Sequence, residues 1–250
     1  MVYSRATLIF AMNRPFLLRP LFACAALFIA APALADEHIL LTGGPALREW
    51  EDFRAPETQH DRWWGNFVRA SRVRIQDLKP QLPPSTTITW LVYREAYARR
   101  SNEDGRPLVS FIESVRDTYG VKLVWVRNGD DVIDYINRGA NRRSTKVAGF
   151  EYFGHSNKHC FMLDYSSEVY GASASWLHER DLANLRSSAF APGAFCKSWG
   201  CHTGESMSAE WKKATGIWMI GANGKTDYAF GHLNGWRPRL SSGSSWRERG

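Results

Sequence analysis

The stretch Val147-Ala-Gly-Phe-Glu-Tyr-Phe153, followed at once by Gly154-His155-Ser156, indicates how this chain folds. A short, mostly apolar and aromatic run that ends at a glycine is typical of a buried strand. A second run of this kind, Ala194 to Trp199, is followed by Gly200-Cys201-His202. Two buried strands, far apart in the sequence, therefore each end in chemically reactive side chains.

Outward from these two runs, strand-like and helix-like segments alternate along the chain. Short β-rich or apolar segments predict strands at residues 87–92, 121–126, 147–153, 194–199 and 217–221. Amphipathic segments predict helices at residues 107–119, 132–137, 177–185 and 205–214. Strands that alternate with helices form a parallel sheet covered on both faces. We expect an α/β fold, a three-layer sandwich with a mostly parallel central sheet.

The first 35 residues predict a secretory signal peptide. They hold three arginines and no acidic residue, an apolar run at 21–31, and the small-residue pattern Ala33-Leu34-Ala35. The apolar run is shorter than the roughly 20 residues of a membrane-spanning helix, and no later stretch reaches that length. We expect an exported protein, periplasmic or extracellular, without a transmembrane segment. Whether synthesis starts at Met1 or Met12 stays open.

Cleavage after Ala35 leaves 250 − 35 = 215 residues, which suits one domain. Within them we expect a helical N-terminal extension at 36–84, where tryptophans recur at helical spacing, an α/β domain at 85–235 and a flexible basic tail at 236–250. The net charge of +7 falls to 7 − 3 = +4 in the mature chain. This charge is too small to indicate a nucleic-acid partner.

Three cysteines remain after Cys24 leaves with the signal: Cys160, Cys196 and Cys201. An odd number leaves at least one unpaired thiol per monomer in a compartment where disulfides form. A bridge between Cys160 and Cys196 would leave Cys201 free, but the sequence leaves the pairing open.

His155 and Cys201 are the candidate catalytic residues. If their strands are neighbours in a parallel sheet, both side chains lie at the same edge, where ligands bind in such folds. An imidazole beside a thiol can take its proton, which thiol catalysis requires because a free thiol is mostly protonated at neutral pH. A helix beginning near Thr203 would add the positive end of its dipole beside Cys201.

This order of strand, histidine beside a glycine, and, 201 − 155 = 46 residues later, strand, small residue and cysteine resembles the caspase, legumain and gingipain group of cysteine peptidases. The resemblance covers roughly Thr86 to Tyr228. It implies that Cys201 is the nucleophile, that His155 is the general base or acid, and that backbone N–H groups near Ser156, Gly200 and Cys201 form the oxyanion hole. It also implies a peptide or protein substrate and no cofactor.

One departure from that group concerns Ser156, because its members usually have a glycine directly after the histidine. A side chain at this position would narrow the oxyanion hole. No residue matches a specificity pocket of the group, so Asp164, Glu205 and Asp227 are nearby acids that are candidates for substrate binding.

Two alternatives remain open. The first is a non-catalytic binding or interaction protein that keeps the fold, for which Ser156 is the argument. The second is a metal-binding protein that uses the cluster His155, His159, Cys160, Cys201 and His202, although their spacing fits no compact zinc motif. The sequence has neither the Gly-x-Ser-x-Gly elbow of serine hydrolases nor a glycine-rich phosphate loop.

Overall fold

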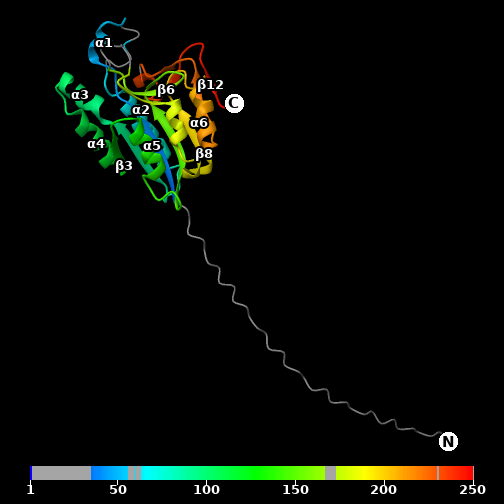
Figure 1. Ribbon diagram of the computed structural model, residues 1–250. Helices are drawn as coiled ribbons and strands as arrows, with labels where there is room; N and C mark the ends of the chain where they lie inside the picture. The colour runs from blue at the N-terminus through cyan, green and yellow to red at the C-terminus, as the bar shows by residue number, and fades with distance from the viewer. Residues whose placement is uncertain (2–34, 56–58, 60–62, 167–172, 230, 250) are drawn as a thin grey trace. The chain divides into compact units, whose positions relative to one another are not determined.

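The computed structural model describes residue 1 and residues 35–55, 59, 63–166, 173–229 and 231–249 (Figure 1). The predicted signal peptide therefore lies outside the described residues, except for its two ends. The fold described below belongs to the compact unit at residues 34–250.

A seven-stranded sheet in the order β12-β9-β8-β4-β1-β2-β3 is the central layer of the described chain. Its strands are β1 (Ala35–Thr42), β2 (Thr87–Tyr93), β3 (Lys122–Val126), β4 (Thr145–Phe153), β8 (Phe190–Ser198), β9 (Met219–Asn223) and β12 (Ser245–Arg247). Every neighbouring pair is parallel except β12 with β9, which is antiparallel. The prediction of a mostly parallel central sheet is confirmed.

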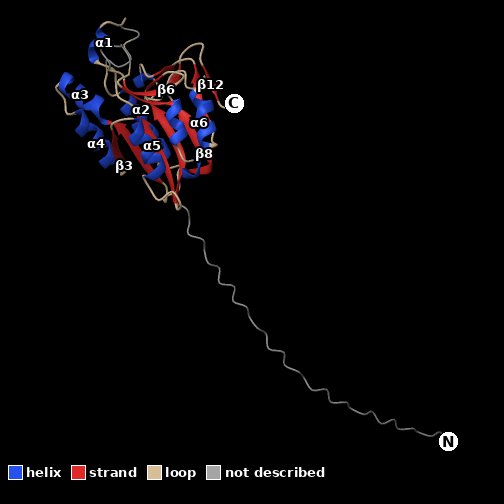
Figure 2. Ribbon diagram, in the orientation of Figure 1, coloured by secondary structure: helices blue, strands red, loops and turns tan. Residues whose placement is uncertain are grey.

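Helices cover both faces of this sheet (Figure 2). The described helices are α1 (Arg48–Asp52), α2 (Asn66–Leu78), α3 (Arg94–Asp104), α4 (Leu108–Tyr119), α5 (Gly129–Arg138) and α6 (Met207–Thr215). Ile39 and Leu41 of β1 pack with α5 and α6, whereas Leu40 points to the other face and packs with α2 and α4. This alternation follows from the two-residue period of a strand. The three-layer α/β sandwich is confirmed.

Two smaller sheets stand beside the central one. The strands β5 (His155–Ser156), β6 (Cys160–Asp164) and β7 (Ser175–His178) form an antiparallel sheet, and β10 (Thr226–Asp227) pairs with β11 (Arg239–Leu240). The predicted helix at 177–185 is wrong. Leu177 and His178 belong to β7, and a 3₁₀ turn follows at Glu179–Asn184, whose N-terminus the His178 side chain caps.

The predicted helical extension at 36–84 is wrong at its start. Strand β1 occupies 35–42 and lies inside the sheet between β2 and β4 (Figure 1). Glu37 and His38, which suggest an exposed segment, are 2 % and 4 % exposed. Glu37 is accommodated because Tyr135 donates a hydrogen bond of 2.6 Å to its carboxylate and Arg142 forms an ion pair with it. Only the later part of the segment, with α1 and α2, is helical.

The predicted flexible tail at 236–250 is also wrong over much of its length. Residues 239–240 form β11 and residues 245–247 form β12 at the edge of the central sheet. Trp246 packs edge-on against Trp199, with ring centroids 5.5 Å apart, and Arg237 forms an ion pair of 2.7 Å with Asp77 of α2. The tail is ordered because strand pairing and aromatic packing, both non-local, hold it.

None of the helices in the described ranges is both long and apolar enough to cross a membrane.

Candidate active site

The ends of β4 and β8 bring the two candidate catalytic residues to one cavity. These strands are parallel neighbours, and His155 and Cys201 follow them by two and three residues. Both side chains line a cavity of about 380 Å³, a volume typical of a small-ligand site. Its other described lining residues are Arg54, Phe67, Gly154, Lys225, Thr226, Tyr228 and Ser241.

The imidazole of His155 is held by aromatic packing. The ring of Phe67, from α2, meets it edge-on at a centroid distance of 5.0 Å, and the ring of Tyr165 lies 5.3 Å away. The Tyr152 hydroxyl donates a hydrogen bond of 2.5 Å to the backbone carbonyl of His155. A Cβ atom at Gly154 would lie 2.5 Å from that hydroxyl oxygen. A glycine before the histidine therefore lets the tyrosine fix the position of the turn.

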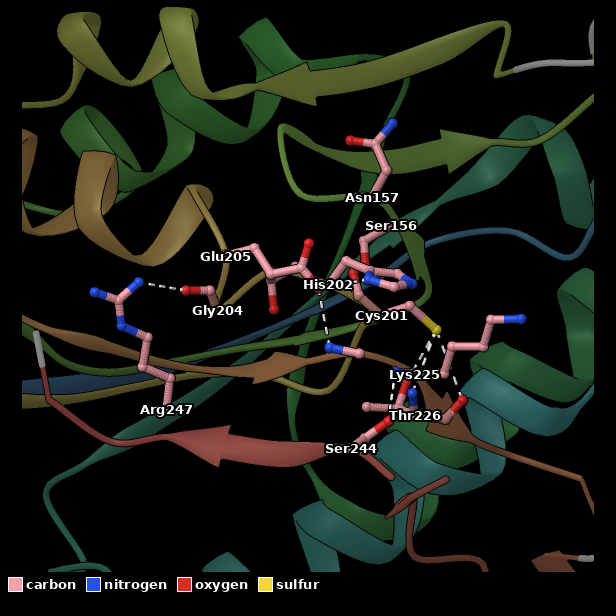
Figure 3. Close-up of polar contacts among 12 residues, drawn as sticks. Ser156, Asn157, Cys201, His202, Gly204, Glu205, Lys225, Thr226, Ser244 and Arg247 are labelled. Atoms are coloured by element: carbon pink, nitrogen blue, oxygen red, sulfur yellow. Dashed lines mark hydrogen bonds and ion pairs between the residues drawn. The ribbon is translucent and has the colours of Figure 1, made fainter. Parts of the chain in front are cut away.

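The Cys201 thiol is half-buried, and its hydrogen-bonding contacts with described residues are with Thr226. The backbone N–H of Thr226 donates to Sγ at 3.4 Å, while the Thr226 hydroxyl and carbonyl oxygens lie 3.5 and 3.6 Å from it (Figure 3). As a thiol, Cys201 can donate to either oxygen. As a thiolate, it keeps the N–H donor, which stabilises the charged form.

The turn after the thiol is bonded tightly to the loop that follows β9. His202 has a φ of 61°, unusual for a residue with a side chain, and its N–H donates to the Gly224 carbonyl at 2.6 Å. Its Nδ1 pairs with Glu205 at 2.6 Å, and the other bond of that carboxylate comes from the Gly224 N–H at 3.0 Å. The hydrogen bond from His202 is the main cause that lowers the pKa of Glu205.

Helix α6 begins later than the sequence indicates. Its first residue is Met207, not a residue near Thr203, and the N–H of Met207 donates to the Lys158 carbonyl at 2.9 Å. The turn at 202–206 therefore separates the helix from Cys201 along the chain. The N–H group that donates to the thiol belongs to Thr226 and not to the first turn of a helix.

Ser156 and Gly200 are close to the site but do not line the cavity. The Ser156 hydroxyl donates to the Cys201 carbonyl at 2.7 Å, and a Cβ atom at Gly200 would lie 2.1 Å from that hydroxyl oxygen. The Ser156 side chain is therefore not among the described residues that line the cavity, where we expected it to narrow the oxyanion hole. The Gly200 N–H donates to the Ser198 hydroxyl at 3.2 Å, so it is engaged and is not an oxyanion donor in this conformation.

The three acids named as candidates for substrate binding all have partners inside the protein, and none of them lines the cavity. Asp164 is almost fully buried and pairs with Arg99 at 2.7 Å. Asp227 pairs with Arg239 at 2.9 Å, and Glu205 holds the turn described above. Each carboxylate already has a charged or hydrogen-bonding partner within the protein. We therefore infer that these acids stabilise the fold and do not bind a basic substrate.

The residues of the metal alternative do not come together as a ligand set. His159 pairs with Glu179 at 2.8 Å, His202 pairs with Glu205, and Cys160 lies against Asn157 at 3.5 Å. In the described part of the chain, no three His, Cys, Asp or Glu side chains are grouped so that they could hold a metal ion. The predicted five-residue cluster is therefore wrong as a metal centre.

Two cations in the cavity were not expected from the sequence. Arg54 comes from the loop after α1 and Lys225 from the turn after β9. Arg54 forms an ion pair of 3.2 Å with Glu51, whereas Lys225 takes part in none of the ion pairs between described residues. Among the described lining residues there are these two cations and no carboxylate. Only the folding of two distant loops brings these side chains together.

Limited labelling at neutral pH is expected to modify Cys201 before the other two thiols. All three are free, but burial raises the pKa of Cys160 and raises the pKa of Cys196 to about 12, so both are almost wholly protonated. Alkylation needs the thiolate and access to it. Mass spectrometry of the protein after treatment with limiting iodoacetamide measures the order. Earlier labelling of Cys160 or Cys196 would contradict this assignment.

Comparisons of the chain with protein-family models, with curated proteins and with solved structures find no match, so the functional argument rests on the residues of the cavity.

Proposed function

We propose that this protein is a thiol hydrolase that cleaves a peptide or amide bond, with Cys201 as nucleophile and His155 as the group that moves the proton. The observation that carries the proposal is the cavity that both side chains line at the carboxyl ends of two parallel neighbours. The resemblance to caspase-like cysteine peptidases points to the same two residues. A half-buried thiol with a fixed N–H donor also suits the role.

In this mechanism His155 accepts the proton of the Cys201 thiol, and the sulfur forms a bond to the substrate carbonyl carbon. The bond from that carbon to the leaving nitrogen then breaks, and the protonated imidazole gives its proton to the departing amine. The product is a thioester on Cys201. Water, deprotonated by His155, attacks the thioester carbon and releases the acid and the thiol.

The charge of the cavity favours a substrate with a carboxylate near the bond that is cleaved. Arg54 and Lys225 line it together with Cys201, and the described lining contains no acidic side chain to compete for them. Phe67 and Tyr228 supply an aromatic wall, their rings edge-on at 4.8 Å. An acidic side chain that enters would meet positive charge at one end and apolar carbon along its stem.

Hydrolysis of a fluorogenic peptide library tests the proposal. The mature protein is expected to release the fluorophore, and acidic peptides are expected to react fastest. Lys225→Glu should lower kcat/KM for acidic peptides by about tenfold or more, because it replaces attraction by repulsion. For matched basic peptides the same variant should raise kcat/KM.

The controls separate the activity from its specificity. Cys201→Ala removes the nucleophile, so any cleavage that persists in that variant belongs to a contaminant. Lys213→Glu reverses a charge on the exposed face of α6, where Lys213 pairs with Glu210, and should leave the preference unchanged. If the wild type cleaves peptides and Lys225→Glu does not change the preference among them, the proposed preference for acidic substrates is rejected. The proposed hydrolase activity would still stand.

A further inference from the structure

The loop that contacts the thiol is itself held by the C-terminal segment at 239–247. Thr226 is 8 % exposed and forms the short strand β10, which pairs with β11 so that Thr226 lies opposite Leu240. Next to it, Asp227 forms an ion pair of 2.9 Å with Arg239 of β11. The position of the residue that contacts Cys201 Sγ is thus fixed by a strand that is close to the end of the chain.

Further hydrogen bonds join the same segment to the loop at 224–226 and to the turn that follows Cys201. The Lys225 N–H donates to the Ser244 hydroxyl at 2.8 Å, and Arg247 donates to the Gly204 carbonyl at 3.0 Å (Figure 3). Gly224 has a φ of 92°, and a Cβ atom there would lie 2.5 Å from the Ser244 hydroxyl oxygen. The segment therefore packs closely on the loop at 224–226 and on the turn after Cys201.

A second anchor of Thr226 is its own side chain. Its hydroxyl donates to the Trp199 carbonyl at 2.8 Å, and Trp199 follows directly after β8, two residues before Cys201. This bond ties the loop at 224–226 to the strand that carries the thiol. With the hydroxyl engaged in this way, the Thr226 N–H is held where it points at Cys201 Sγ.

We propose that Thr226 is a positioning residue for the Cys201 thiol, and that the C-terminal segment at 239–247 keeps Thr226 in place through the Arg239–Asp227 ion pair. The proposal rests on the proposed function, since it takes Cys201 as the reacting group. Thr226 acts through its backbone N–H and through the hydroxyl that orients it, and it takes no part in bond making. The segment at 239–247 then contributes to the geometry of the site.

Thr226→Val is the decisive variant, because valine keeps the shape and removes the hydroxyl. The rate of alkylation of Cys201 by iodoacetamide at pH 7 is expected to fall by about tenfold, the effect of one weakened hydrogen bond to a charged group. kcat for hydrolysis should fall with it while KM stays nearly constant. Thr226→Ser restores the hydroxyl and should restore both rates.

A matched control is Thr215→Val. Thr215 is also buried, and its hydroxyl donates to a backbone carbonyl, that of Trp211, at the same 2.8 Å. This variant should lower the melting temperature about as much as Thr226→Val and leave the alkylation rate of Cys201 unchanged. If lower stability alone slowed the alkylation of Cys201, the rate would fall in both variants. That result would overturn the proposal.

A second pair of variants tests the C-terminal segment. Arg239→Gln breaks the ion pair with Asp227 and should slow alkylation of Cys201 by about two- to threefold, since a looser loop holds the donor less well. Arg237→Gln breaks a nearby ion pair, with Asp77 on α2, and should not change the rate. Equal rates for the two variants would reject the role of Arg239.

These readouts also distinguish this proposal from the hydrolase. Alkylation of Cys201 needs no substrate, so its rate reports on Thr226 even if no peptide is cleaved. A wild type that alkylates fast and cleaves nothing contradicts the proposed function alone. A Thr226→Val variant that alkylates and turns over as fast as the wild type contradicts the positioning role alone.

Discussion

Replacing His155 by alanine is expected to lower kcat by about 10²- to 10⁴-fold, the usual contribution of a general acid and base. Without the imidazole, the described lining of the cavity holds no other histidine and no carboxylate to take the thiol's proton and return it to the leaving amine. The alkylation rate of Cys201 at neutral pH should fall as well. The measurements are steady-state hydrolysis and timed alkylation, each with a thermal unfolding curve to confirm folding.

His159→Ala is the matched control for this variant. His159 lies only four residues on, but it pairs with Glu179 and is not among the residues that line the cavity. Its loss should leave kcat and the alkylation rate unchanged. If His155→Ala retains the alkylation rate and kcat of the wild type, His155 does not act on Cys201. The proposal that these two residues work as a catalytic pair must then be abandoned.

Replacing Glu151 by leucine is expected to destabilise the protein by about 3–5 kcal/mol, because it leaves buried donors without their acceptor. Glu151 is fully buried in β4. It accepts hydrogen bonds from His38 at 2.9 Å, from Arg74 at 2.7 Å and from the Trp199 indole at 2.9 Å. Chemical denaturation measures the loss. Glu210→Leu, which removes an exposed partner of Lys213, should cost less than about 1 kcal/mol.

The same carboxylate predicts an acid limit of stability. Burial opposes its charge, but the hydrogen bond from His38 and the charges of His38 and Arg74 outweigh burial and lower the pKa of Glu151 below its ordinary value of 4.5. A lowered pKa means that the stabilisation is complete above about pH 4.5 and is lost as the pH falls through the folded-state value. The unfolding free energy of Glu151→Leu should therefore decline less in acid. An equally steep decline in both proteins would assign the acid limit to other groups.

The strands and helices that the sequence predicts correctly are those with a local signal. Residues 147–153 and 87–92 are mostly apolar, aromatic or β-branched, and 107–119 repeats its apolar side chains at helical spacing. Helix α3 has no such signal, since its sequence REAYARRSNED is polar almost throughout and only Ala96, Tyr97 and Arg100 are buried. Its position is decided by packing against α4, which a local pattern does not contain.

The candidate site divides in the same way. His155 and Cys201 could be found because each follows a recognisable strand. Since neighbouring parallel strands end at the same edge of the sheet, the two residues could be predicted to lie close together. Thr226 and Lys225 could not be found, because the turn at Gly224, with its φ of 92°, decides where they point. Arg54 is brought in by a loop whose path no local pattern encodes. The sequence therefore predicts the two candidate catalytic residues better than it predicts the other residues that line the cavity.

The place of β1 inside the sheet also has a consequence for how the chain folds. Strand β1 is synthesised before either of its partners, β2, which begins at residue 87, and β4, which begins at residue 145. Until β4 has been synthesised, the hydrophobic core that buries Ile39 and Leu41 is incomplete, and one edge of β1 has no strand to pair with. Such long-range pairing slows folding and exposes apolar strands to aggregation. We therefore expect the protein to fold slowly. We also expect it to depend on chaperones until residues 145–153 have been synthesised and can pair with β1.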